Sequence, residues 1–158
     1  MLIYQQESCE LTLKEGIEEY RKYLRVNNRH VLGENCSEDE KLTILGHDAT
    51  HVIFGLDTSL EEESMLDCWV IFGGDVFKII KEYFKGSLDL KETNEKVFDL
   101  ANEVGYLKFT YLYLRVMFQK WPKIFFRTRK MKKWSYFFPA DFLEKKISAL
   151  RKLSLIHI

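Results

Sequence analysis

The spacing of apolar residues predicts a helical protein. Between residues 13 and 25, apolar side chains recur every three or four positions, which places them on one face of a helix; they are Leu13, Ile17, Tyr20 and Leu24. Thr12 and Glu15 have the spacing of a capping box, in which each side chain binds a free backbone amide at the start of this helix. No segment alternates apolar and polar residues as a strand would, and the chain has only two prolines. The predicted fold class is therefore all-α.

Start and stop signals divide the rest of the chain into further helices. Ser37 and Glu40 form a second capping box, before a helix that should end near Gly55. With 158 residues the chain can bury one core, and we expect residues 1–152 to form a single-domain bundle of about five to seven helices. A third helix is expected from a cap at Asp57, Thr58 or Ser59, through Gly73 and Gly74, to residue 84, and a fourth over residues 93–104. The apolar stretch 106–118 should be a helix that is buried or faces a membrane, and Pro122 should bend or end it. A last helix is expected over residues 139–152.

Charge is balanced overall but separated along the chain. Lysine and arginine number 24, as do aspartate and glutamate, so no global field draws the protein to nucleic acid, and we expect no such partner. Residues 120–133 contain seven basic and no acidic residues, whereas residues 57–67 contain five acidic and no basic ones. The three cysteines, Cys9, Cys36 and Cys68, form no Cys-x-x-Cys pair, which is typical of free thiols in a reducing compartment.

The two ends of the chain give further expectations. The first residues lack a secretory signal, and no apolar stretch is long enough for a transmembrane helix, so the expected location is the cytoplasm. Residues 153–158 match the translation of a common sequencing-library adapter. We therefore expect them to be an artefact, and we assign no function to His157.

The strongest chemical signal is a pair of histidines. His47 and His51 are four residues apart, so on a helix they lie about 40° from each other on one side. Asp48 lies about 100° from His47, and Glu63 follows beyond the next turn. Two imidazoles and one carboxylate suit zinc, with a fourth position left for water or substrate, and they also suit non-haem iron. Spacing alone leaves open two ordinary half-buried histidines beside a capped helix.

Two carboxylates compete for the third ligand position. Adjacent residues rarely reach one ion without strain, so Asp48 can instead orient a histidine or carry a proton as a catalytic residue. Glu63 can reach the metal because the turn at residues 55–59 folds the next helix back. We predict His47, His51 and Glu63 as ligands of the metal, with Asp48 on or beside it.

The motif His-Asp-x-x-His, followed after eleven residues by Glu, resembles the signature of the coenzyme Q (ubiquinone) biosynthesis protein 4 family. Three runs carry the similarity to compact bacterial members, at residues 13–20, 47–60 and 67–73. The similarity extends over roughly residues 11–142 and is most specific between residues 47 and 73.

This resemblance implies an all-α fold and a divalent metal, usually zinc, at the positions matching His47, Asp48, His51 and Glu63. It also implies a role in ubiquinone biosynthesis on a polyprenylated aromatic-ring intermediate. The family has been assigned decarboxylation of the ring, which implies a metal-dependent lyase, and also a scaffolding role for the other pathway enzymes. This chain is shorter than eukaryotic members and lacks a mitochondrial targeting segment, so the metal site transfers more directly than the substrate.

The second half of the chain contains residues suited to lipid. The apolar stretch 106–118 can line a site for an isoprenoid tail, and the following segment mixes aromatic with basic residues, as at a membrane with anionic headgroups. The alternative is a core helix followed by a solvated basic face. On the first interpretation the protein is peripheral to the inner face of the membrane. The candidate lipid or membrane contacts are Leu112, Val116, Trp121, Phe125, Lys130 and Trp134.

Three functions stay open on the sequence. The first is a metal-dependent enzyme of quinone-ring maturation, whose expected partners are a polyprenylated quinone precursor, the membrane surface, other quinone-biosynthesis enzymes and a second copy in a homodimer. The second is a non-catalytic scaffold or prenyl-lipid-binding protein. The third is a phosphohydrolase of the His-Asp type, which needs a further histidine and a distant aspartate, for which His30 and Asp99 are available.

Overall fold

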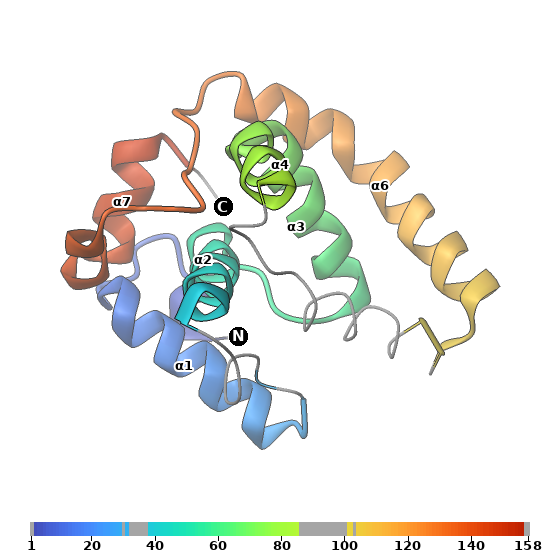
Figure 1. Cartoon of the computed structure of the whole chain (residues 1–158), viewed down its shortest axis with the longest axis horizontal. Helices are drawn as coiled ribbons and strands as arrows, with labels where there is room; N and C mark the ends of the chain where they lie inside the picture. Colours follow the sequence, from blue (N-terminus) through green and yellow to red (C-terminus); the bar gives the residue numbers. More distant parts are fainter. Residues whose placement is uncertain (1, 30, 32–37, 86–100, 103, 157–158) are drawn as a thin grey trace.

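The structure, a computed structural model, describes residues 2–29, 31, 38–85, 101–102 and 104–156. In this part of the chain it contains α-helices and two short 3-10 helices but no strand, which confirms the all-α prediction. Figure 1 shows α2 near the centre, with α1 on one side and α3 and then α6 on the other. The elements are η1 (Ile3–Gln5), α1 (Leu13–Val26), α2 (Glu38–Phe54), α3 (Leu60–Gly73), α4 (Val76–Phe84), α6 (Tyr106–Thr128), η2 (Ala140–Glu144) and α7 (Ile147–Ser154).

Helix α2 forms the centre of the core. It contacts α1, α3 and α7, and its Ala49, Val52 and Ile53 side chains are fully buried. All four residues of the predicted apolar stripe of α1 are buried as well. The capping box of α1 is confirmed, because the Glu15 N–H donates to the Thr12 hydroxyl at 3.2 Å and the Thr12 N–H donates to the Glu15 carboxylate at 2.8 Å.

Helix α2 ends where the sequence predicts. Gly55 follows it with a φ of 68°, in the left-handed region that favours glycine. The Leu56 N–H then donates to the His51 carbonyl at 2.9 Å, which closes the last turn. The predicted capping box of Ser37 and Glu40 lies outside the described side chains.

The single helix expected to run to residue 84 is two helices, so that prediction is wrong. Gly74 is extended, with φ −104° and ψ −176°, and caps α3 by donating its N–H to the Val70 carbonyl. The Gly73 carbonyl accepts from the Trp134 N–H at 2.9 Å, a partner from the segment that follows α6. The chain therefore leaves the axis of α3 before α4 begins.

For helix α6 the buried alternative is wrong, whereas contact with a membrane stays a prediction. The helix continues through Pro122 to its end at Thr128, so the proline does not terminate it. It is not buried all round, because among the described helices only α3 packs along it (Figure 1); Leu107 is 90% and Phe118 71% exposed. Among the described residues no helix is both long and apolar enough to cross a membrane. The helix expected over residues 93–104 lies mostly outside the described part.

The last expected helix is a 3-10 helix followed by α7. Pro139 precedes η2 as the sequence indicates, but the backbone is extended at Lys145 and Lys146. The helix is interrupted there because the Lys145 carbonyl accepts from the Leu13 N–H at 2.9 Å, which joins this segment to the start of α1. Ile156, in the segment that matches an adapter, is 2% exposed and packs in the core.

A buried arginine fastens the end of α2. Arg151 on α7 is 1% exposed, and burial lowers its pKa to about 10. Its guanidinium donates at 2.8 Å to the carbonyls of Val52 and Ile53 in the last turn of α2, and at 2.6 Å to those of Tyr4 and Gln6. The final carbonyls of a helix have no partner within it, and Arg151 supplies the donor for the Ile53 carbonyl, while that of Val52 also accepts from the Gly55 N–H at 3.3 Å.

Candidate functional site

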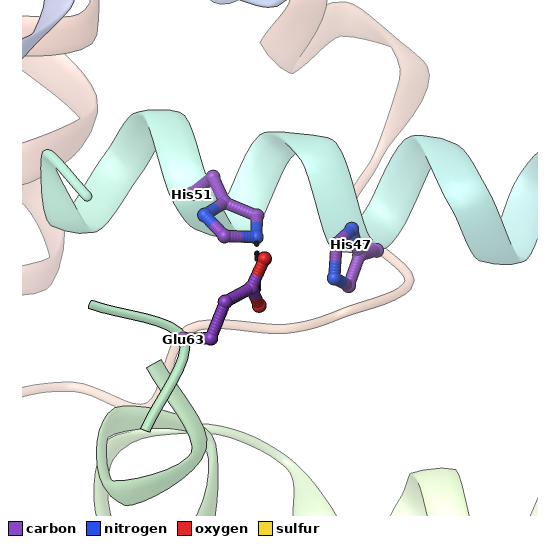
Figure 2. A group of neighbouring side chains, drawn as sticks. All are labelled: His47, His51 and Glu63. Carbon is purple, nitrogen blue, oxygen red and sulfur yellow. Dashed lines mark ion pairs between the residues drawn. The ribbon is translucent and has the colours of Figure 1, made fainter. Parts of the chain in front are cut away.

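The two histidines of α2 and a carboxylate of α3 converge. His47 and His51 lie one turn apart and present their rings to the same side of α2 (Figure 2), with ring centroids 4.7 Å apart. Glu63 points up from α3 toward them, and its Oε2 lies 3.5 Å from His51 Nε2. One ligand atom from each residue lies within 4.8 Å of the other two. The structure thus brings together the three residues predicted as ligands.

Glu63 reaches α2 because of how α3 begins. Ser59 caps α3, and its hydroxyl accepts from the Glu62 N–H at 3.3 Å. The Glu62 carboxylate accepts a hydrogen bond from the Asp57 N–H, which ties the first turn of α3 to the chain leaving α2. The Glu63 N–H donates to the Ser59 carbonyl at 2.9 Å. This closed first turn keeps Glu63 opposite the histidines.

Asp48 faces Arg21 of α1. Its Oδ2 lies 2.6 Å from Arg21 Nε, and its side chain is only 5% exposed. Its Oδ1 lies 3.4 Å from His47 Nδ1. Burial favours a raised pKa, but hydrogen bonding and charge from His47 and the Arg21 guanidinium outweigh it and hold the pKa of the Asp48 carboxyl below its usual range. An ionised Asp48 can orient His47 through Nδ1 and leave Nε2 for a ligand.

Asp48 lies outside the group of three residues that converge. Its geometry favours a role in orienting His47 over direct binding of a metal, since Asp48 Oδ1 faces His47 Nδ1 and Asp48 Oδ2 is held by Arg21. Ligation by Asp48 and its part in catalysis stay predictions.

An aromatic ring from α1 covers His51. The Tyr20 ring stacks on the imidazole with centroids 4.9 Å apart and planes 20° apart, and both side chains are 0% exposed. Burial, with the negative charges of Asp48 and Glu63, raises the pKa of Tyr20 well above its ordinary value. Tyr20 is therefore a neutral hydroxyl next to a predicted ligand.

A second acidic residue lies one turn beyond Glu63. The Asp67 carboxylate accepts a hydrogen bond from the hydroxyl of Tyr113 on α6. Partial desolvation raises the pKa of Asp67 despite this bond, and the negative charge of Glu63 adds to the increase. The pair ties α6 to the part of α3 that carries Glu63.

The donor set fits a small divalent cation. In a tetrahedral zinc site with bonds of about 2.0–2.1 Å, neighbouring ligand atoms are about 3.3 Å apart. The His51–Glu63 separation of 3.5 Å is close to this value, and the group as a whole needs only a modest contraction from 4.8 Å. Two neutral imidazoles and one carboxylate leave a divalent ion with net positive charge, which favours an anionic fourth ligand.

The other candidate site residues are more scattered. Trp134 is 2% exposed and lies 5.6 Å from Phe138 between ring centroids. Its ring packs in the core, and a lipid contact at Trp134 stays a prediction. His30 and Asp99, considered for a phosphohydrolase, lie outside the described residues. The remaining lipid-contact candidates are wholly or partly accessible: Leu112, Val116, Trp121, Phe125 and Lys130.

Sequence reasoning missed two residues of this site. The sequence assigns Tyr20 only to the apolar stripe of α1, although a hydroxyl within such a stripe needs a hydrogen-bond partner, which is a signal that it can have a further role. Arg21 has no comparable signal, since it binds a residue 27 positions away through tertiary packing.

No protein-family model, no curated protein and no solved structure matches this chain.

Proposed function

We propose that this protein binds one divalent metal ion through His47, His51 and Glu63, and acts on an aromatic acid that carries an apolar tail. One observation carries the proposal: three ligand atoms from two helices converge within 4.8 Å. Zinc is the best fit to two imidazoles and a carboxylate, and iron is the second. Three protein ligands leave a position for a substrate oxygen.

The chemistry follows from the surroundings of the three ligands. A bound metal ion would act as a Lewis acid toward phenolic or carboxylate oxygens of the ring. Asp48 holds the His47 ring in place, and Arg21 holds Asp48. Tyr20 and the core beneath it keep water from one side of His51. The reaction that we propose is removal of the ring carboxyl group in ubiquinone biosynthesis, which the motif resemblance favours.

Exposed apolar faces support an apolar tail and a membrane surface. On α6, Leu107, Tyr111, Leu114 and Phe118 recur at spacings of four, three and four, so they share one face, and each is at least 45% exposed. The same helix has five basic and no acidic residues. Apolar side chains beside lysine and arginine suit an anionic lipid surface.

A non-catalytic scaffold or prenyl-lipid-binding protein is the second candidate. It is favoured by the same exposed residues of α6 and by those of α4, where Phe77 is 76% and Phe84 82% exposed. Exposed apolar patches of this kind mark interaction surfaces. On this alternative the metal would be structural, with all four positions filled by protein.

The decisive experiment is the metal content of the purified protein by mass spectrometry. Wild type is compared with His47→Ala and Glu63→Ala, and with Glu61→Ala as a matched control, since Glu61 is an exposed carboxylate in the same helical turn. We expect about one metal per chain in wild type and control, and loss in both ligand variants. A metal-free wild type would overturn the proposal and leave lipid binding as the better account.

Given a bound metal, turnover separates the two candidate functions. Polyprenylated hydroxybenzoates are incubated with the metal-loaded wild type and with Glu63→Ala, and released carbon dioxide is measured. Release by the wild type alone supports the enzyme; no release, with tight lipid binding by both, supports the scaffold.

A further inference from the structure

Tyr20 places a buried, unpaired hydroxyl-bearing side chain next to the candidate metal site. It projects from α1, is 0% exposed, and its ring lies flat against His51. Its hydroxyl finds no hydrogen-bond partner within the part of the chain that the structure describes. Buried hydroxyls are nearly always paired, so an unpaired one beside a candidate metal site calls for a partner that is not protein.

Tyr4 shows what the core does with a hydroxyl that has only a structural task. Its ring lies 6.2 Å from that of Tyr20, and it is also 0% exposed. The Tyr4 hydroxyl donates to the Leu56 carbonyl at 2.9 Å, so its polar group is satisfied within the fold. Of these two buried tyrosines, Tyr20 is the one that stacks on His51 and whose hydroxyl is unpaired.

The Tyr20 ring borders the three predicted ligands, because it stacks on His51, whose Nε2 lies 3.5 Å from Glu63 Oε2. The negative charges of Asp48 and Glu63 also raise the pKa of its hydroxyl, after burial itself. Neither accepts a hydrogen bond from it, and Asp48 is engaged by Arg21 and His47. A donor beside these residues and bonded to none of them is available to a ligand that binds at His47, His51 and Glu63.

We infer that the Tyr20 hydroxyl donates a hydrogen bond to an anionic oxygen of the molecule bound at the His47–His51–Glu63 centre, and so selects carboxylates and phenolates. This inference rests on the proposed metal site. It assigns Tyr20 to recognition of the substrate, whereas His47, His51 and Glu63 hold the ion. Phenylalanine at position 20 could not donate this hydrogen bond, and the loss of a hydrogen bond to a charged group lowers affinity by about tenfold or more.

The test measures ligand affinity directly and needs no turnover. Wild type, Tyr20→Phe and Tyr4→Phe are loaded with Co²⁺, and each is titrated with 4-hydroxybenzoate while the visible absorption of the bound cobalt is recorded. Tyr20→Phe keeps the ring that stacks on His51 and removes only the oxygen. We expect all three to bind one Co²⁺ and Tyr20→Phe alone to lose about tenfold or more in affinity.

The outcomes separate this inference from the metal proposal. Equal affinity in Tyr20→Phe and wild type overturns the role of Tyr20 and leaves the metal site standing. A wild type that binds no Co²⁺ overturns both.

A measurement on the wild type covers the case in which Tyr20→Phe does not fold. Binding of 4-hydroxybenzoate to the Co²⁺ protein should perturb the near-ultraviolet absorption of a tyrosine, because a buried hydroxyl gains a hydrogen bond. An unchanged tyrosine spectrum at saturation contradicts the inference.

Discussion

The Arg21 guanidinium and the Asp48 carboxylate meet at 2.6 Å, and this ion pair joins α1 to the residue directly after His47. Asp48 is almost wholly buried, whereas the Arg21 side chain is 30% exposed. Removal of Arg21 would leave a buried acceptor without its strongest partner. The position of His47 therefore depends on a helix that contributes no predicted ligand.

Arg21→Ala should lower the free energy of unfolding by about 1–3 kcal/mol, because Asp48 keeps its burial and loses its partner. Denaturant unfolding measures this, and Lys22→Ala, an exposed neighbour on α1, is the control. The double variant with Asp48→Asn should be less destabilised than the sum of the single ones. Additive losses would show that the two residues do not interact in solution.

Arg151→Ala should be far more severe. It removes four hydrogen bonds. The carbonyls of Val52 and Gln6 keep the N–H groups of Gly55 and Cys9 as donors, whereas those of Tyr4 and Ile53 lose the donor that Arg151 supplies. We expect a loss of about 4 kcal/mol in the free energy of unfolding, which is at the upper end for one substitution. Circular dichroism during heating tests this against Lys152→Ala, an exposed basic residue on the same helix. A variant within about 1 kcal/mol of wild type would mean that water replaces the guanidinium.

Removal of the metal should destabilise the protein. A ligand at a thousand times its dissociation constant adds about 4 kcal/mol to the folded state, which for a domain of this size corresponds to roughly 10 °C in Tm. A chelator should therefore lower the Tm of wild type by about this amount and leave that of His51→Ala unchanged. An identical shift in both would point to a metal bound elsewhere.

The exposed face of α6 should bind anionic membranes. Leu107→Ser combined with Phe118→Ser should reduce sedimentation with vesicles containing phosphatidylglycerol by at least about tenfold, because two large apolar side chains are lost from the contact. Val26→Ser is the control, since Val26 is 73% exposed but lies at the end of α1. Added salt should also weaken binding of wild type. Equal sedimentation of the double variant and wild type would argue against this face.

The sequence predicted features that depend on neighbours in the chain. The stripe and capping box of α1, the end of α2 at Gly55, and the convergence of His47, His51 and Glu63 all follow from short-range spacing and one tight turn. Such features depend on local backbone geometry, which a sequence expresses directly.

Features that depend on distant segments were not predictable in this way. The break between α3 and α4 is completed by Trp134, some sixty residues further along the chain. The exposure of α6 depends on which helices happen to pack on it, since an apolar sequence looks the same whether it meets the core, a membrane or solvent. The ion pair of Arg21 with Asp48 could not be predicted either, because the two residues are 27 positions apart and meet only through tertiary packing.

The four bonds of Arg151 also fix an order of events during synthesis. Its partners Tyr4 and Gln6 are separated from it by 147 and 145 positions, and those in α2 by 99 and 98. A chain still attached to the ribosome can form α1 and α2, but the end of the histidine helix is fastened only after α7 has emerged. An incomplete chain would thus carry His47, His51 and Glu63 without the finished scaffold that holds them.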